Sequence, residues 1–236
     1  MNQKLTLPTL ALAALGILWL PACKKTNSDD LKETVPFYQV YTVNYDKDNN
    51  KTEASAFFLV RDESGSKVEL NNGAAVTANG EEPNSFQLVA TDYDWDFDGL
   101  KDVQFVLTKN SGEKISNTVA TSDIGQIAFP SNMPISISKG TGLTFNWAGD
   151  PLANGETLTV KVTGSPLSTN VTASIDKEIT DGQVVLTSND FKDFAPGTIF
   201  ITLERNKILA LDAKDGTSGG DMTVTTKTKI DMALNN

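Results

Sequence analysis

The strongest constraint on the fold of this chain is a two-residue alternation of apolar and polar side chains, interrupted at short intervals by Gly, Asn, Asp or Pro. In residues 158–162, the sequence Leu-Thr-Val-Lys-Val places the apolar side chains on one side and Thr159 and Lys161 on the other. Because successive side chains of a β-strand point to opposite faces, this pattern predicts strands with one buried and one solvated face. No apolar pattern of helical spacing extends over about 12 residues. We therefore expect an all-β protein.

Turn signals divide the alternating segments into short predicted strands. The first half contains 37–45, 52–60, 68–70, 75–77, 86–91, 93–97, 103–108 and 115–119, and the second half contains 135–138, 143–147, 157–163, 171–175, 184–187, 199–205, 207–211 and 222–232. The pairs Asn72-Gly73 and Asn79-Gly80 supply residues that tolerate positive φ, as tight hairpins require. This spacing of strands and turns is typical of antiparallel sandwiches.

The predicted strands fall into two sets, separated near residues 124–133. Each set has about the 100 residues of one immunoglobulin-like (Ig-like) domain. We therefore predict two tandem antiparallel Ig-like β-sandwich domains, one over residues 35–125 and one over residues 126–236.

The N-terminal segment has the features of a secretory signal. Lys4 precedes an apolar run from Leu10 to Leu20, which has the 7–15 residues of a secretory signal and is too short to span a bilayer. The run ends in Leu20-Pro21-Ala22-Cys23, and the chain then becomes polar. This segment resembles the lipobox of bacterial lipoproteins, in which an aliphatic residue precedes a small residue and the modified cysteine.

The resemblance implies cleavage after residue 22 and acylation of Cys23, which is the only cysteine of the chain. Two or three acyl chains give stable membrane attachment, whereas one does not. We therefore expect residues 1–22 to be a signal peptide and residues 23–34 to be a lipidated N-terminus followed by a flexible tether. Lys24, in place of the Asp that favours retention at the inner membrane, predicts attachment to the outer membrane. An ordinary secretory signal and an uncleaved anchor helix are the alternatives.

Two further resemblances concern the mature chain. The sequence Phe194-Ala-Pro-Gly-Thr-Ile-Phe200 resembles the corner between two strands of fibronectin type III domains, although Phe200 lacks the tyrosine hydroxyl of that family. The alternation of Ile199, Ile201 and Leu203 is also one residue out of that family's register. The lipobox combined with two Ig-like domains is similar to uncharacterised outer-membrane lipoproteins of Bacteroidetes. This resemblance implies no catalytic residues.

The densest acidic motif runs from Asp92 to Asp102. Asp94, Asp96, Asp98 and Asp102, with Gly99, match the first half of an EF-hand calcium loop, but its closing Glu is replaced by Phe105. In the alternative interpretation, the motif is a strand whose aromatic residues face a core while its aspartates face water. The sequence leaves open both a plain acidic strand and weak calcium binding by these four aspartates.

Composition excludes several classes of function. The chain has no histidine, which excludes Ser-His-Asp and Cys-His catalysis and histidine-ligated metals. A formal charge of −10 disfavours nucleic acid as a partner. Trp147 is a candidate for stacking on a sugar, although a core position on a central strand is the more common place for a tryptophan of such domains.

We therefore expect a non-enzymatic protein of the cell envelope with a structural, adhesive or binding role, attached to the membrane through Cys23. A glycan-binding accessory lipoprotein is the first alternative. A glycoside hydrolase that uses paired carboxylates is the second, because this chemistry needs no histidine. We expect no cofactor other than the calcium considered above, and a polysaccharide or an envelope protein as partner.

Overall fold

The computed structural model describes residues 25–84, 91–180 and 182–236. These residues form strands, together with two short 3-10 helices at Ser28–Asp30 and Thr121–Asp123. The prediction of an all-β protein is confirmed. The strands are β1 (Lys25–Asn27), β2 (Phe37–Asp46), β3 (Lys51–Val60), β4 (Lys67–Glu69), β5 (Ala75–Ala78), β6 (Asp92–Asp98), β7 (Val103–Thr108), β8 (Lys114–Val119), β9 (Ile127–Ala128), β10 (Ser136–Ser138), β11 (Leu143–Asn146), β12 (Ala148–Gly149), β13 (Glu156–Pro166), β14 (Ser174–Ile179), β15 (Gln183–Leu186), β16 (Phe194–Leu209) and β17 (Gly220–Asn235).

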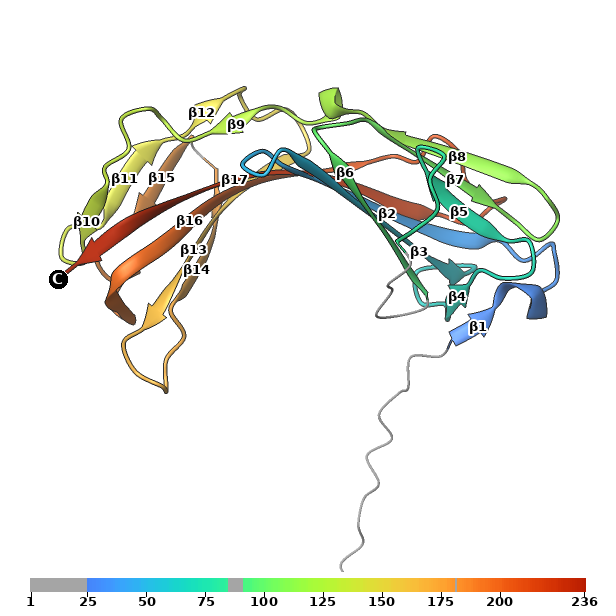
Figure 1. Cartoon of the computed structure of the whole chain (residues 1–236), viewed down its shortest axis with the longest axis horizontal. Coiled ribbons are helices and arrows are strands. Elements are labelled where there is room, and N and C mark those ends of the chain that lie inside the picture. Colours follow the sequence, from blue (N-terminus) through green and yellow to red (C-terminus); the bar gives the residue numbers. More distant parts are fainter. Residues whose placement is uncertain (1–24, 85–90, 181) are drawn as a thin grey trace, which may run out of the picture.

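One ten-stranded sheet extends through the whole molecule and curves into an arch (Figure 1). Its main path has the order β1-β4-β3-β2-β17-β16-β13-β14, while β6 pairs with β3 and β10 pairs with β17. The strands of the first and second halves of the chain meet where β2 runs parallel to β17. β1–β4 and β10–β17 are also parallel pairs, so the predicted antiparallel arrangement holds only for the other pairs of this sheet.

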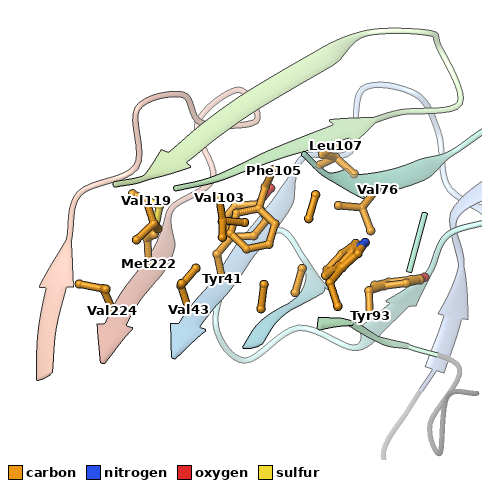
Figure 2. Close-up of a cluster of buried hydrophobic side chains, with 14 of the residues drawn as sticks. Tyr41, Val43, Val76, Tyr93, Val103, Phe105, Leu107, Val119, Met222 and Val224 are labelled. Carbon is orange, nitrogen blue, oxygen red and sulfur yellow. The ribbon is translucent and has the colours of Figure 1, made fainter. Parts of the chain in front are cut away.

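Both hydrophobic cores lie on the same face of this sheet. Met222 and Val224 of β17 belong to the first core, and Met232 and Leu234 of the same strand belong to the second. These four residues differ by even numbers, so their side chains point to one side of the sheet. The three-stranded sheet β5-β7-β8 covers the first core, and β11-β15 covers the second. Figure 2 shows Met222 and Val224 beside Val43 in the first core.

The two long strands β16 and β17 join what the sequence predicts as separate domains. The chain passes from the first core at Ile124 to the second at Ile127, close to the predicted boundary. It then returns to the first core at Met222, so the first sandwich is completed by residues from the end of the chain. The predicted strands 199–205 and 207–211 are also one continuous strand, β16.

A buried ion pair fixes the junction between the two cores. Arg205 and Glu156 have side chains only 1% and 2% exposed and contact each other directly. The Arg205 guanidinium also donates to the carbonyl oxygens of Gln126 (3.1 Å), Asp150 (2.7 Å) and Pro151 (2.8 Å). Since these carbonyls belong to the linker and to the loop before β13, one side chain holds both segments against the sheet.

Part of the segment predicted as a flexible tether, residues 23–34, is attached to the body of the protein. Residues 25–27 form β1 at the edge of the large sheet, and the following 3-10 helix packs against the turn at Asn71. The segment has no alternating apolar pattern, because its attachment depends on hydrogen bonds rather than on a buried apolar face.

One predicted hairpin agrees with the structure: a turn at residues 47–50 joins β2 to β3, with Asn50 at φ 50°. Asn72-Gly73 and Asn79-Gly80 have the expected positive φ but do not join paired strands, because β4 pairs with β1 and β3 while β5 pairs with β7. The strand predicted at 86–91 lies outside the described residues except for the buried Thr91.

Candidate binding surface

Among residues 25–84, 91–180 and 182–236, no hydrophobic core lies on the second face of the large sheet. We call it the open face; its residues alternate with the buried residues of each strand and are aligned by the strand register. It comprises Tyr38, Val40, Thr42, Asn44 and Asp46 of β2, Lys51, Glu53, Ser55, Phe57 and Leu59 of β3, Asp92, Asp94, Asp96 and Asp98 of β6, Thr157, Thr159, Lys161 and Thr163 of β13, Asp176 and Glu178 of β14, Phe200, Thr202, Glu204, Asn206 and Ile208 of β16, and Asp221, Thr223, Thr225, Lys227, Lys229 and Asp231 of β17. Figure 1 shows that this face is the concave side of the arch, with the smaller sheets on the convex side.

Hydroxyl and amide side chains occupy the centre of the open face. Thr157, Asn206, Thr225 and Asn44 lie opposite one another on four successive strands. The Thr225 hydroxyl donates to the Asn206 side-chain oxygen at 2.6 Å, which fixes both groups in the row. Each of these side chains can both donate and accept hydrogen bonds, as sugar hydroxyls do.

Ion pairs flank this polar row. The Lys227 ammonium lies 3.5 Å from a carboxylate oxygen of Asp46 and 3.4 Å from one of Glu53, so it bridges β17, β2 and β3. Lys161 and Glu204 pair at 2.8 Å between β13 and β16. The pKa of Lys161 is raised, first by its hydrogen bond to Glu204. These pairs are partly exposed, so each contributes about 1 kcal/mol or less to stability.

Two shallow hollows lie on the open face. One has a volume of about 260 Å³ and is lined by Asp46, Asp48, Asn49, Thr202, Lys227 and Lys229. The other, of about 280 Å³, is lined by Asn44, Glu53, Ala54, Ser55, Asp94, Trp95 and Asp96. In the first hollow the Asp48 carboxylate accepts from the Thr228 hydroxyl and the Lys229 backbone N–H, so the β2–β3 turn is held against β17.

Two apolar side chains of β16 are exposed on the open face. Phe200 is 42% exposed and Ile208 is 73% exposed, both on β16. The Lys229 ammonium lies 5.3 Å from the centre of the Phe200 ring, a cation–π distance. These exposed carbon surfaces are available to the C–H faces of a ligand.

The aspartates predicted as calcium ligands are not brought together. β6 has the strand geometry of the alternative interpretation, since Tyr93, Trp95 and Phe97 are buried and the aspartates between them point to the open face. Along the described residues, no group of three or more acidic, Cys or His side chains has an arrangement that could hold a metal ion. Asp102 lies apart from β6, where its carboxylate accepts from the Thr121 backbone N–H at 2.7 Å.

The aspartates of β6 repel one another. The pKa of Asp94 is raised, first by partial burial and then by Asp92 and Asp96 on either side of it. Asp92 is neutralised by Lys67 in an ion pair at 2.5 Å. The acidic side chains of the open face outnumber its basic ones, so this face repels polyanions.

Other predicted residues lie elsewhere. Cys23, the predicted lipidation site, lies outside the described residues. Trp147 is half-buried against the second core, with the Arg205 guanidinium 5.8 Å from its ring centre, so it is not on the open face.

Phe200 is exposed while Ile199, Ile201 and Leu203 are buried, as the sequence alternation predicts. Within the described ranges, no helix is long and apolar enough to cross a bilayer.

Sequence reasoning missed the polar row formed by Asn44, Thr157, Asn206 and Thr225. Its only sequence signal was the Thr-rich last strand, which suggested a solvated face without showing which strands would join it.

Comparison with protein-family models finds no match for this chain, and comparison with curated proteins finds no significant match.

Proposed function

We propose that the protein is a lipid-anchored, non-enzymatic component of the outer membrane that binds a neutral polysaccharide on its open face. The observation that carries the proposal is the open face itself, which continues across both halves of the molecule without a covering layer among the described residues. A sheet with one covered and one solvated face is common, and here the solvated face is concave and continues over both cores (Figure 1).

The chemistry of the open face supports a neutral glycan. Asn44, Asn206 and Thr157 offer donors and acceptors on strands spaced about 4.8 Å apart, which suits repeated contacts along an extended polymer. Thr225, only 7% exposed, lies between Asn44 and Asn206 and fixes Asn206 through its hydroxyl. Ile208, two residues from Asn206 on β16, supplies apolar surface next to the row, and Phe200 supplies more about 20 Å farther along the same strand. The excess of carboxylates disfavours anionic polysaccharides and nucleic acids.

The lipid anchor is supported by the sequence. Cys23 is the only cysteine and follows an apolar signal and a small residue, as lipidation requires. Replacing Cys23 by Ala, or inhibiting the lipoprotein signal peptidase, is expected to leave a longer precursor without acyl label. An unchanged product would remove the anchor from the proposal.

Binding is tested by titrating the mature chain against a panel of soluble neutral and acidic polysaccharides. We expect at least one neutral polymer to bind and the acidic polymers to bind more weakly at low salt. Failure of all neutral polymers would refute glycan binding while leaving the anchor unaffected.

One hollow favours a second candidate function. Glu53 lies directly opposite Asp96 on the neighbouring strand, and both line the hollow of about 280 Å³ together with Asp94. Side chains in such cross-strand positions have Cβ atoms roughly 5 Å apart, close to the carboxyl separation of retaining glycosidases. Release of reducing ends from a bound polymer, lost in Glu53→Gln and in Asp96→Asn, would support a hydrolase. Binding without release supports the non-enzymatic role.

A further inference from the structure

We infer that the anchored protein rests directly on the membrane at the β1 edge of the large sheet, with no flexible spacer between lipid and fold. The partner of this edge is the lipid surface itself. The inference builds on the proposed lipidation of Cys23, but it concerns the residues on the C-terminal side of that cysteine.

The first described residues are attached to the body of the protein. β1 pairs in parallel with β4, with Lys25 opposite Lys67 and Asn27 opposite Glu69. The Lys25 ammonium also forms an ion pair with the Glu69 carboxylate. An edge strand of three residues is held weakly by its ladder alone, so the contacts made by the next residues matter.

The 3-10 helix after β1 supplies those contacts. Ser28 is 2% exposed, and its hydroxyl donates to the Asn71 side-chain oxygen at 2.8 Å while accepting from the Asn71 backbone N–H at 3.0 Å. The Asp29 backbone N–H donates to the same Asn71 oxygen at 3.2 Å, and the Asn72 side chain donates to the Asp29 carboxylate. Two turns of the chain are thereby joined by a closed set of hydrogen bonds.

The segment that leads from this helix to β2 is attached as well. Leu31 packs against the first core. The Val35 carbonyl accepts from the buried Lys109 ammonium at 3.1 Å, and the Pro36 carbonyl accepts from the Arg61 backbone N–H at 2.9 Å. The chain from residue 25 to residue 36 therefore has no free stretch that could act as a linker.

Covalent geometry then limits the distance to the lipid. Only Lys24 stands between Cys23 and Lys25, and two peptide steps span at most about 7 Å. Lys25 is level with Lys67, which in turn lies opposite Leu59 near the end of β3. The end of the sheet where β3 finishes and β2 begins is therefore next to the membrane, and the turn at residues 47–50 is at the opposite end of these strands.

The inference is tested by neutron reflectometry on a supported phosphatidylcholine bilayer. The mature chain is coupled through its only thiol, at Cys23, to a maleimide lipid, so the measurement does not depend on lipidation in cells. In the native protein we expect protein density to begin at the headgroups. Inserting 12 Gly and Ser residues between Lys24 and Lys25 should add a flexible segment of about 20 Å and move or broaden the protein layer by up to that distance.

Two matched variants complete the test. The same 12-residue insertion in the exposed loop between Thr169 and Asn170 should leave the layer at the headgroups, because it adds length away from the anchor. Ser28→Ala with Asn71→Ala should release residues 25–30, whose contacts depend on these two side chains, and shift or broaden the layer in the same direction as the N-terminal insertion but by less.

A native layer as distant or as broad as that of the N-terminal insertion would overturn the inference. Absence of acyl label in cells would instead remove the proposed lipidation, and the coupled protein would still decide whether the edge rests on the bilayer.

Discussion

The buried ion pair at the junction gives the most quantitative prediction. Glu156→Gln removes the charge that neutralises Arg205, whose side chain is only 1% exposed. Leaving one buried charge without its partner costs about 3 to 5 kcal/mol of unfolding free energy. We expect a value near the lower limit, because the single glutamine oxygen can still accept from one of the two backbone N–H groups, of Gly125 or Ala153, that donate to the two Glu156 oxygens. For a chain of this size, the melting temperature should fall by roughly 6 to 12 °C.

The assay is urea unfolding at several pH values, with Glu204→Gln as the matched control. Glu204 also pairs with a cation, Lys161, but both side chains are partly exposed, so its loss should cost about 1 kcal/mol or less. Burial would raise the pKa of Glu156, but the hydrogen bonds from Arg205, Ala153 and Gly125 outweigh it and hold the pKa below its ordinary value of 4.5.

The sign of the pH dependence is set by that lowered pKa. A carboxyl whose pKa is lower in the folded protein contributes stability above its ordinary pKa and loses it as the pH falls through the folded value. The difference between native protein and Glu156→Gln should therefore be complete at pH 7 and shrink below about pH 4.5. If Glu156→Gln costs no more than the Glu204 control at pH 7, the junction is not held by this pair and the reasoning fails.

Three further predictions concern single side chains. Gly125→Ala should destabilise the protein by about 1 to 3 kcal/mol in urea unfolding, because a Cβ there would lie 2.2 Å from the Arg205 guanidinium; an unchanged midpoint would contradict the close approach. Asp215→Asn should cost about 3 kcal/mol in the same assay, since it leaves Lys109, 5% exposed, without its carboxylate, and a cost below about 1 kcal/mol would contradict it. Asp94→Asn should raise the melting temperature slightly at pH 7 and have less effect at pH 4, because its raised pKa marks a carboxylate that is unfavourable when charged; a decrease at pH 7 would be inconsistent with repulsion along β6.

The alternation of apolar and polar residues predicted most strands, but it wrongly divided β16 into two strands after Arg205. The buried positions of β16 continue the sequence Ile199, Ile201, Leu203 with Arg205, a charged residue in a core position. Because the pattern depends on apolar side chains, the sequence suggested that a strand ended there. Only the structure shows that Glu156, from a distant part of the chain, neutralises this arginine and allows the strand to continue.

The pairing of strands could not be predicted from local patterns. An alternating strand such as β17 shows which residues face a core, but not that β2 is its neighbour or that both cores share one face. The open face results from these long-range pairings, so its row of Asn44, Thr225, Asn206 and Thr157 was invisible in the sequence. The acidic strand β6 was predictable because its aromatic and acidic residues alternate strictly within one segment.

The proposal that the open face binds polysaccharide is tested most directly by blocking its centre. Thr42→Arg places a long side chain beside the polar row, while Gln104→Arg places the same side chain on the exposed surface of β7, on the covered side of the molecule. Isothermal titration of both variants with a neutral polymer that binds the native chain gives the comparison. We expect binding to weaken at least about tenfold, or 1.4 kcal/mol, in Thr42→Arg and to be unchanged in Gln104→Arg. Equal affinity of the two variants would contradict binding on the open face.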